Sequence, residues 1–257
     1  MYTILISLAS GIVIALGIKL LGFPLWAGII PGVLALLVAF LLLARWVSKR
    51  VQVHTDAMQK QFDPQPTNQK ELQQAVARAL KDLEQALAYE KWQLTVGPGI
   101  HAQMGILKYM VKDLDGALVH FQQSTPSNAL AKVLPQDPMA KALEGALHYQ
   151  RKNYTAMESA FEAAVGYGKK DPVVWAAYAW CLLQIKERDK ALRVLSRAVD
   201  ANPSDEKLKA SLTQVQNDKR LKMKPYEPGW WNFGLETPPP QAPVGGRGRR
   251  VQFINRR

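Results

Sequence analysis

Residues 172–203, PVVWAAYAWCLLQIKERDKALRVLSRAVDANP, decide the fold that this sequence predicts. Their apolar side chains recur every three or four residues in two runs, first Trp175, Tyr178, Ala179 and Leu182, then Ala191, Leu195 and Ala198. This spacing places the apolar side chains on one face of each of two helices. The stretch therefore predicts a pair of amphipathic helices, closed by Pro203.

The same pattern recurs twice earlier in the chain. A shift of 34 residues aligns this pair with Gly145, Met157, Phe161 and Ala164. A further shift of 40 residues aligns it with Gly105, Ala117, Phe121 and Ser124. In each pair a small residue lies where the two helices would cross, and the large residues Phe121, Phe161 and Leu195 are expected to fill the space between neighbouring pairs. The sequence therefore predicts an all-α fold with three stacked helix pairs over residues 98–205.

At these positions the segment resembles the tetratricopeptide repeat family, whose unit has about 34 residues and the pattern W-x₂-L-G-x₂-Y…A-x₃-F…P. Three positions depart from it, because Lys108 and His148 replace the Tyr and Lys169 replaces the closing Pro. Six extra residues fall around 127–136, where we expect a longer loop. The resemblance implies a short helical-repeat solenoid whose first helices line a concave surface that binds a protein partner or peptide.

The predicted partner groove follows from one face of the three first helices. It contains eight residues: Ile106, Tyr109, Met110, Tyr149, Gln150, Trp180, Leu183 and Gln184. This face carries none of the Lys, Arg or Asn residues with which the chaperone-binding members of the family clamp a terminal carboxylate. An apolar groove lined by aromatic residues is expected instead. An alternative stays open, in which Tyr109, Tyr149 and Trp180 pack under another element of the same chain.

Both ends of such a stack need a cap, because each terminal pair leaves one apolar flank uncovered. Residues 67–97 contain an apolar stripe at Leu72, Val76, Leu80, Leu83 and Leu87, which predicts an amphipathic helix that caps the repeats. Residues 206–224 predict a second capping helix, preceded by Ser204 and Asp205.

The last segment, residues 225–257, begins with a run of aromatic residues between Pro and Gly. Trp230, Trp231 and Phe233 are predicted to dock, either into the groove of the same chain or onto a partner. From about residue 236 the chain is rich in Pro, Gly and Arg, and this composition predicts disorder.

The first 50 residues predict a transmembrane helical hairpin. Two apolar runs, residues 2–21 and 26–46, are each about 30 Å long as helices, which is the thickness of the hydrocarbon core of a bilayer. The turn residues Gly22 and Pro24 separate them. A cleaved signal peptide is the alternative, although no Lys or Arg precedes the first run. We expect residues 51–66 to form a juxtamembrane linker that keeps the following helix separate from the second span.

Charge predicts which side of the membrane the soluble region occupies. Arg45, Lys49 and Arg50 follow the second run, whereas Lys19 alone lies near the turn. The positive-inside rule then places the soluble region in the cytoplasm, with a bacterial inner membrane as the expected location. Of the net charge of +12, the 17 basic and 15 acidic side chains of residues 61–203 supply only +2. Such a balance argues against nucleic acid as a partner and favours contacts of the basic ends with membrane lipid, although an RNA contact of the Arg tail is a further alternative.

The sequence offers no catalytic, cofactor-binding or metal-binding residues. It has no phosphate-binding Gly loop, none of its four His residues are paired at helical spacing, and its single Cys181 lies in an apolar run. We therefore expect a non-catalytic membrane-anchored scaffold or adaptor that holds a partner protein, or copies of itself as a homo-oligomer, at the cytoplasmic face. The alternative is a constitutive subunit of a larger membrane complex, with Gly11, Gly17, Gly28 and Gly32 packed against other spans.

Overall fold

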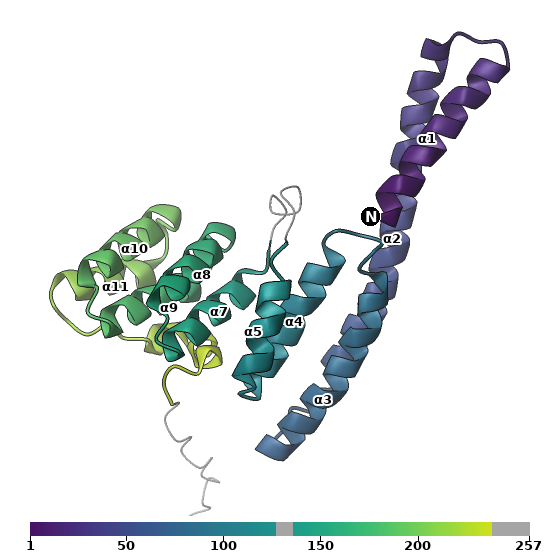
Figure 1. Ribbon diagram of the computed structural model, residues 1–257. Coiled ribbons are helices and arrows are strands. Elements are labelled where there is room, and N and C mark those ends of the chain that lie inside the picture. Colours follow the sequence, from purple (N-terminus) through teal and green to yellow (C-terminus); the bar gives the residue numbers. More distant parts are fainter. Residues whose placement is uncertain (127–135, 238–257) are drawn as a thin grey trace, which may run out of the picture.

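The computed structural model describes residues 1–126 and 136–237, and every regular element in that part is a helix (Figure 1). The all-α prediction is therefore confirmed. Most of the longer loop expected around residues 127–136, and nearly all of the tail expected to be disordered, lie outside the described residues.

The N-terminal arm consists of α1 (Tyr2–Leu20), the short η1 (Leu25–Gly28) and the first half of α2 (Ile29–Lys60). The two long helices approach so closely that a methyl group added at Gly11 would lie 2.8 Å from the Gly32 carbonyl oxygen. A methyl group added at Gly28 would likewise lie 2.8 Å from the Ala15 carbonyl oxygen. These three glycines therefore serve the hairpin itself, which differs from the expectation that they pack against other spans. A methyl group added at Gly17 would meet no described atom within 4 Å.

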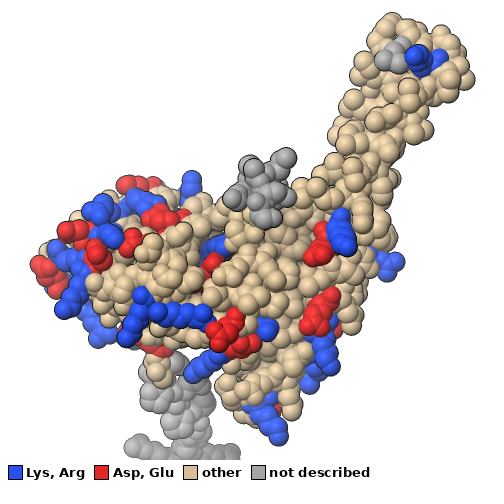
Figure 2. All heavy atoms as spheres, viewed as in Figure 1, with Lys and Arg blue, Asp and Glu red and all other residues tan. Residues whose placement is uncertain are grey.

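The outer surface of the arm is apolar. Both arm helices are long and apolar enough to cross a membrane. Large side chains such as Leu5, Val13 and Leu37 are exposed along them. Figure 2 shows an arm with almost no charged side chains beside a body on which both signs of charge are interspersed.

The second helix continues well beyond the predicted span, so the expected linker over residues 51–66 is wrong for residues 51–60. These residues are the end of α2, which packs against α3 (Gln69–Ala86). Val47 is completely buried and belongs to the same apolar cluster as Ala79 and Leu83 of α3. Because this apolar seam joins the two helices, α3 is not separate from the second span as we expected.

The capping segment before the repeats is shorter than expected. Asn68 accepts a hydrogen bond from the Glu71 N–H and so caps the start of α3. The helix ends at Ala86, and η2 (Leu87–Tyr89) leads into an irregular connection to α4.

Three antiparallel helix pairs follow. They are α4 (Val96–Met110) with α5 (Leu114–Gln123), α7 (Pro138–Gln150) with α8 (Tyr154–Tyr167), and α9 (Pro172–Gln184) with α10 (Arg188–Ala201). Each pair turns through a Lys with positive φ, namely Lys112, Lys152 and Lys186 at 63°, 59° and 65°. The same backbone turn therefore recurs in all three repeats.

The small residues lie at the helix crossings, as the sequence predicts. Phe121 and Phe161 pack against the Gly of their own pair, whereas we expected them to fill the space between neighbouring pairs. A methyl group added at Gly105 would lie 2.6 Å from the Phe121 ring, and one added at Gly145 would lie 2.6 Å from the Phe161 ring. In the third pair Ala179 and Leu195 are both completely buried at the equivalent positions. A small residue thus faces a large one in every repeat, which lets the two backbones approach.

The last helix, α11 (Glu206–Gln216), closes the stack against α10 and α9. It is shorter than the capping helix expected over residues 206–224. The helix ends because Asn217 leads into Asp218, whose φ of 56° is left-handed and incompatible with a continued helix. From there the chain turns back toward the first helices of the repeats.

Candidate functional site: the concave face and its strap

The C-terminal part of the described chain crosses the faces of the first helices. We call residues 221–236 the strap; it contains η3 (Lys224–Tyr226) and η4 (Gly229–Phe233) and appears in yellow beside α7 and α9 (Figure 1). Five of its side chains are buried: Leu221, Met223, Tyr226, Trp230 and Phe233. Short 3₁₀ turns suit this segment because its Pro and Gly residues disfavour a longer helix.

Trp230 is the centre of the contact between the strap and the repeats. Its side chain is 1% exposed, and its ring centroid lies 5.2 Å from that of Trp180 on α9. The Trp180 ring in turn lies 5.8 Å from the Tyr149 ring of α7 in an edge-on arrangement. On the other side, the Phe233 ring lies 5.9 Å from Trp230. The aromatic residues of the second and third repeats and of the strap therefore form one packed group.

A hydrogen bond joins the strap to the first repeat. The Tyr109 hydroxyl donates to the Phe233 carbonyl oxygen at 2.6 Å, and it accepts from the Gln150 side-chain amide at 3.0 Å. Burial raises the pKa of the Tyr109 hydroxyl far above its ordinary value, so it stays protonated and able to donate.

The other end of the strap is fixed at α11. The hydroxyls of Tyr226 and Ser211 lie 2.8 Å apart and are both buried. Burial raises the pKa of Tyr226 to about 12. Farther along, the Trp230 indole N–H donates to Glu236 at 3.1 Å, and the same carboxylate pairs with Arg220 at 3.1 Å. Every buried polar group named here has a partner, as expected of a contact formed within one folded unit.

The predicted groove is therefore largely covered. Tyr109 and Trp180 are buried under the strap, which is the second of the two possibilities that the sequence left open for them. Tyr149 and Ile106 are half-buried and pack against the same core. Of the predicted docking residues, Trp230 and Phe233 are buried against the protein's own repeats, and Trp231 is half-buried.

Two hollows remain on this face, one on each side of the strap. The first has a volume of about 410 Å³ and is lined by predicted groove residues and strap residues, among them Tyr109, Met110, Gln150 and Trp231. The second has a volume of about 620 Å³ and is lined by Trp180, Leu183, Gln184, Arg188 and Arg220, among others. The exposed members of the predicted groove are thus divided between two separate sites.

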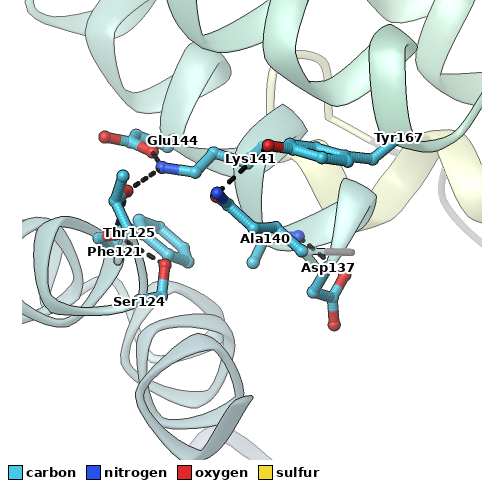
Figure 3. Close-up of polar contacts among 9 residues, drawn as sticks. Phe121, Ser124, Thr125, Asp137, Ala140, Lys141, Glu144 and Tyr167 are labelled. Atoms are coloured by element: carbon cyan, nitrogen blue, oxygen red, sulfur yellow. Dashed lines mark hydrogen bonds and ion pairs between the residues drawn. The ribbon is translucent and has the colours of Figure 1, made fainter. Parts of the chain in front are cut away.

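A buried ion pair in the second repeat was not found by sequence reasoning. The Lys141 ammonium lies 2.7 Å from Glu144 and also donates to the Thr125 hydroxyl (Figure 3). Both charged side chains are about a tenth exposed and face a hollow of about 380 Å³ that His148 also lines. The sequence nevertheless contained a signal for this buried pair. Lys141 and Glu144 occupy the positions at which the third repeat has the large residues Trp175 and Tyr178.

The structure also brings together two His residues that are distant in sequence. The Nδ1 atoms of His101 on α4 and His120 on α5 lie 3.1 Å apart. Burial lowers the pKa of both. Among the residues that the structure describes, no three His, Cys, Asp or Glu side chains gather closely enough to hold a metal ion. Cys181 is buried, and burial raises the pKa of its thiol, which makes it a poor nucleophile.

Stacked antiparallel helix pairs, each with the same turn and the same crossing, define a helical-repeat protein. A family model described as a tetratricopeptide repeat matches residues 148–215, from the end of α7 into α11, and this match supports the resemblance to that family. Neither a curated protein nor a solved structure matches the sequence.

Proposed function

We propose that this protein is a non-catalytic, membrane-anchored tetratricopeptide repeat scaffold. It holds a partner protein at the cytoplasmic face of a membrane, which we infer to be a bacterial inner membrane. Tetratricopeptide repeats are protein-interaction modules, and this general role is supported by the family match. The membrane, the side and the contact surface are our proposals, and each rests on a separate observation.

Support for the anchor comes from the length and surface of the arm. The 19 residues of α1 span about 28 Å, close to the thickness of the hydrocarbon core. Exposed Leu, Ile and Val side chains cover the arm, as a lipid environment requires. Close packing of Gly11 on Gly32 and of Gly28 on Ala15 supports a retained hairpin over a cleaved signal peptide. The basic residues Arg45, Lys49 and Arg50 favour the cytoplasmic side for the body.

We propose that the partner binds at the hollow of about 410 Å³. Met110 is 45% exposed at its edge, beside the exposed Gln150 and the half-buried Trp231. Removing the strap would expose Trp230 and Phe233, two side chains that are now buried. We therefore treat the strap as a fixed wall of the site, against which a partner places an apolar side chain.

A photoreactive residue at Met110 of the full-length protein, activated in living cells, tests this contact. The matched control is the same residue at Val119, which is 52% exposed on α5 and lines neither hollow. We expect a discrete crosslinked protein from position 110 and none from position 119. The same products from both positions, or none from either, would contradict the proposed site.

A constitutive subunit of a larger membrane complex is the second candidate. The open space at Gly17 favours it, because another span could approach there. Mass measurement of the detergent-solubilised protein separates the two candidates: the scaffold predicts a monomer or a small oligomer, whereas the subunit predicts a fixed large assembly.

A further inference from the structure

The connection between α3 and α4 returns to the base of the arm. The backbone N–H groups of Tyr2 and Thr3 donate to the carbonyl oxygens of Lys91 and Trp92 at 3.0 and 3.2 Å. From the same connection, the Gln93 side-chain amide donates to the Ala44 carbonyl oxygen of α2 at 3.2 Å. Residues 91–93 are therefore held at the level of the first turn of α1 and of Ala44.

This level coincides with the end of the apolar part of α2. From Trp26 in η1 to Trp46 in α2 the apolar helical stretch extends about 30 Å, which matches the hydrocarbon core of a bilayer. Arg45, Lys49 and Arg50 follow at the end of that stretch, and all three are exposed. If the arm spans a membrane, residues 91–93 therefore lie at the level of the phospholipid headgroups.

Four aromatic side chains from three segments gather at this level. The Trp92 ring lies 5.6 Å from the Tyr2 ring and 5.1 Å from the Trp46 ring. The Tyr89 ring lies 6.1 Å from Trp46. Tyr and Trp favour the membrane interface because one part of the side chain is apolar and the other forms hydrogen bonds.

Basic side chains surround this aromatic group. The Arg50 guanidinium lies 5.8 Å from the centroid of the Trp46 ring, and Lys91 is exposed on the connection. With Arg45 and Lys49 they supply four positive charges, against the exposed Glu90 among residues 89–93. A surface that is aromatic and basic at one level matches the headgroup region of an anionic bilayer.

We propose that residues 89–93, together with Trp46, Lys49 and Arg50, form a docking surface for anionic phospholipid headgroups. This inference rests on the proposed membrane anchor and adds a second contact between the protein and the bilayer. The continuous helix α2 and its seam with α3 connect this surface to the repeats. The repeats are then held at a fixed height and tilt, so that a bound partner is presented beside the membrane.

The depth of Lys91 tests the docking surface. A single environment-sensitive fluorophore is placed by Lys91→Cys in the Cys181→Ala protein, reconstituted at full length in nanodiscs with a quencher at headgroup level. The matched control is Lys70→Cys, which is also exposed and lies at the far end of α3. We expect strong quenching at position 91 and little at position 70. Equal, weak quenching at both positions would overturn the docking surface.

A third label, Val38→Cys in the middle of α2, separates this inference from the anchor itself. Quenching at position 38 by a quencher deep in the bilayer, without headgroup quenching at position 91, would retain the anchor and overturn the docking surface. Absence of quenching at position 38 would overturn both.

Lipid selectivity gives an independent measurement. The measured quantity is the ratio of phosphatidylglycerol to phosphatidylcholine that copurifies with the protein from a mixed bilayer. In the triple variant Lys49→Gln, Arg50→Gln, Lys91→Gln this ratio should fall about twofold or more. The control Lys70→Gln, Arg78→Gln, Lys81→Gln removes three charges from α3 away from this level and should leave the ratio unchanged. An equal loss in both variants would contradict a local headgroup contact.

Discussion

The second and third repeats share one backbone arrangement and differ in the side chains that fill it. In the third repeat Ala179 and Leu195 occupy the crossing positions and are completely buried, and Trp175, Tyr178 and Leu182 are buried as well. At the equivalent positions the second repeat has Gly145, Phe161, Lys141, Glu144 and His148. Both repeats keep a small residue opposite a large one, and both turn through a Lys with positive φ. The crossing and the turn thus define the repeat, whereas the remaining positions accept charged residues when these are paired.

The apolar side chains of the third repeat pack against the strap. Removing a side chain from this contact should therefore cause the largest loss of stability. Trp230→Ala should lower the free energy of unfolding by about 4 kcal/mol, because it removes a completely buried ring that packs on Trp180. Urea unfolding of the full-length protein in detergent micelles measures this loss. Trp231→Ala is the control, and it should cost much less because Trp231 is only half-buried. Equal costs for the two variants would argue against the strap contact.

Removing one partner of the buried ion pair in the second repeat should cause the next largest loss of stability. Glu144→Leu should lower the free energy of unfolding by about 3 kcal/mol, because it leaves the Lys141 ammonium buried without its carboxylate. The double variant Lys141→Met, Glu144→Leu should recover most of that stability, because an apolar pair then fills the site as in the third repeat. The same urea unfolding measurement checks both variants. A double variant no more stable than Glu144→Leu would contradict the idea that an apolar pair can replace the ion pair at these positions.

The crossing offers a smaller and more specific test. Gly145→Ala should cost about 1–2 kcal/mol, because the added methyl group would lie 2.6 Å from the Phe161 ring. Adding Phe161→Leu reproduces the pair of the third repeat and should make the double variant more stable than the sum of the two single changes predicts. Thermal unfolding of all three variants gives this coupling. Strict additivity would show that the two positions do not form the crossing described.

The smallest expected effect concerns pH. Burial, which outweighs the opposing influence of Glu144, lowers the pKa of His148 in the folded protein. The unfolded chain then binds the proton more readily, so this His destabilises the fold as pH falls below its ordinary pKa of about 6.5. Leu182 occupies the equivalent position in the third repeat and does not titrate. His148→Leu should therefore reduce the fall in Tm between pH 7.5 and 5.5, and an unchanged or larger fall would contradict this.

Much of the architecture could be predicted because it depends on local spacing. The positions of Gly105, Gly145 and Ala179 relative to their large partners identified the repeats, and two apolar runs identified the hairpin. The extension of α2 to Lys60 was missed because the apolar run ends at Trp46 and the Pro-containing stretch of residues 63–66 suggested a linker. A signal was nevertheless present, since Val47, Val51 and Met58 share one helix face and belong to the apolar cluster that includes α3 and α4.

The site was only partly predictable, because it depends on contacts between distant segments. Composition identified Trp230 and Phe233 as docking residues, and helix periodicity identified Tyr109 and Trp180. Their meeting requires α11 to end at Gln216 and the chain to reverse, which local patterns did not indicate. The contact of Trp92 with Tyr2 likewise joins residues far apart in sequence, and spacing within one helix carries no information about it.

Closure of the concave face by the protein's own strap can be tested most directly with an engineered disulfide. A Cβ atom at Gly229 would lie 3.8 Å from the Cβ of Val173, which suits a disulfide. The full-length variant Val173→Cys, Gly229→Cys, Cys181→Ala should therefore form an intramolecular disulfide under mild oxidation and remain a single chain on a non-reducing gel. The variant with Gly229→Cys and Cys181→Ala alone is the control. Thiols that stay reduced, or that link two chains together, would contradict a strap bound to its own repeats.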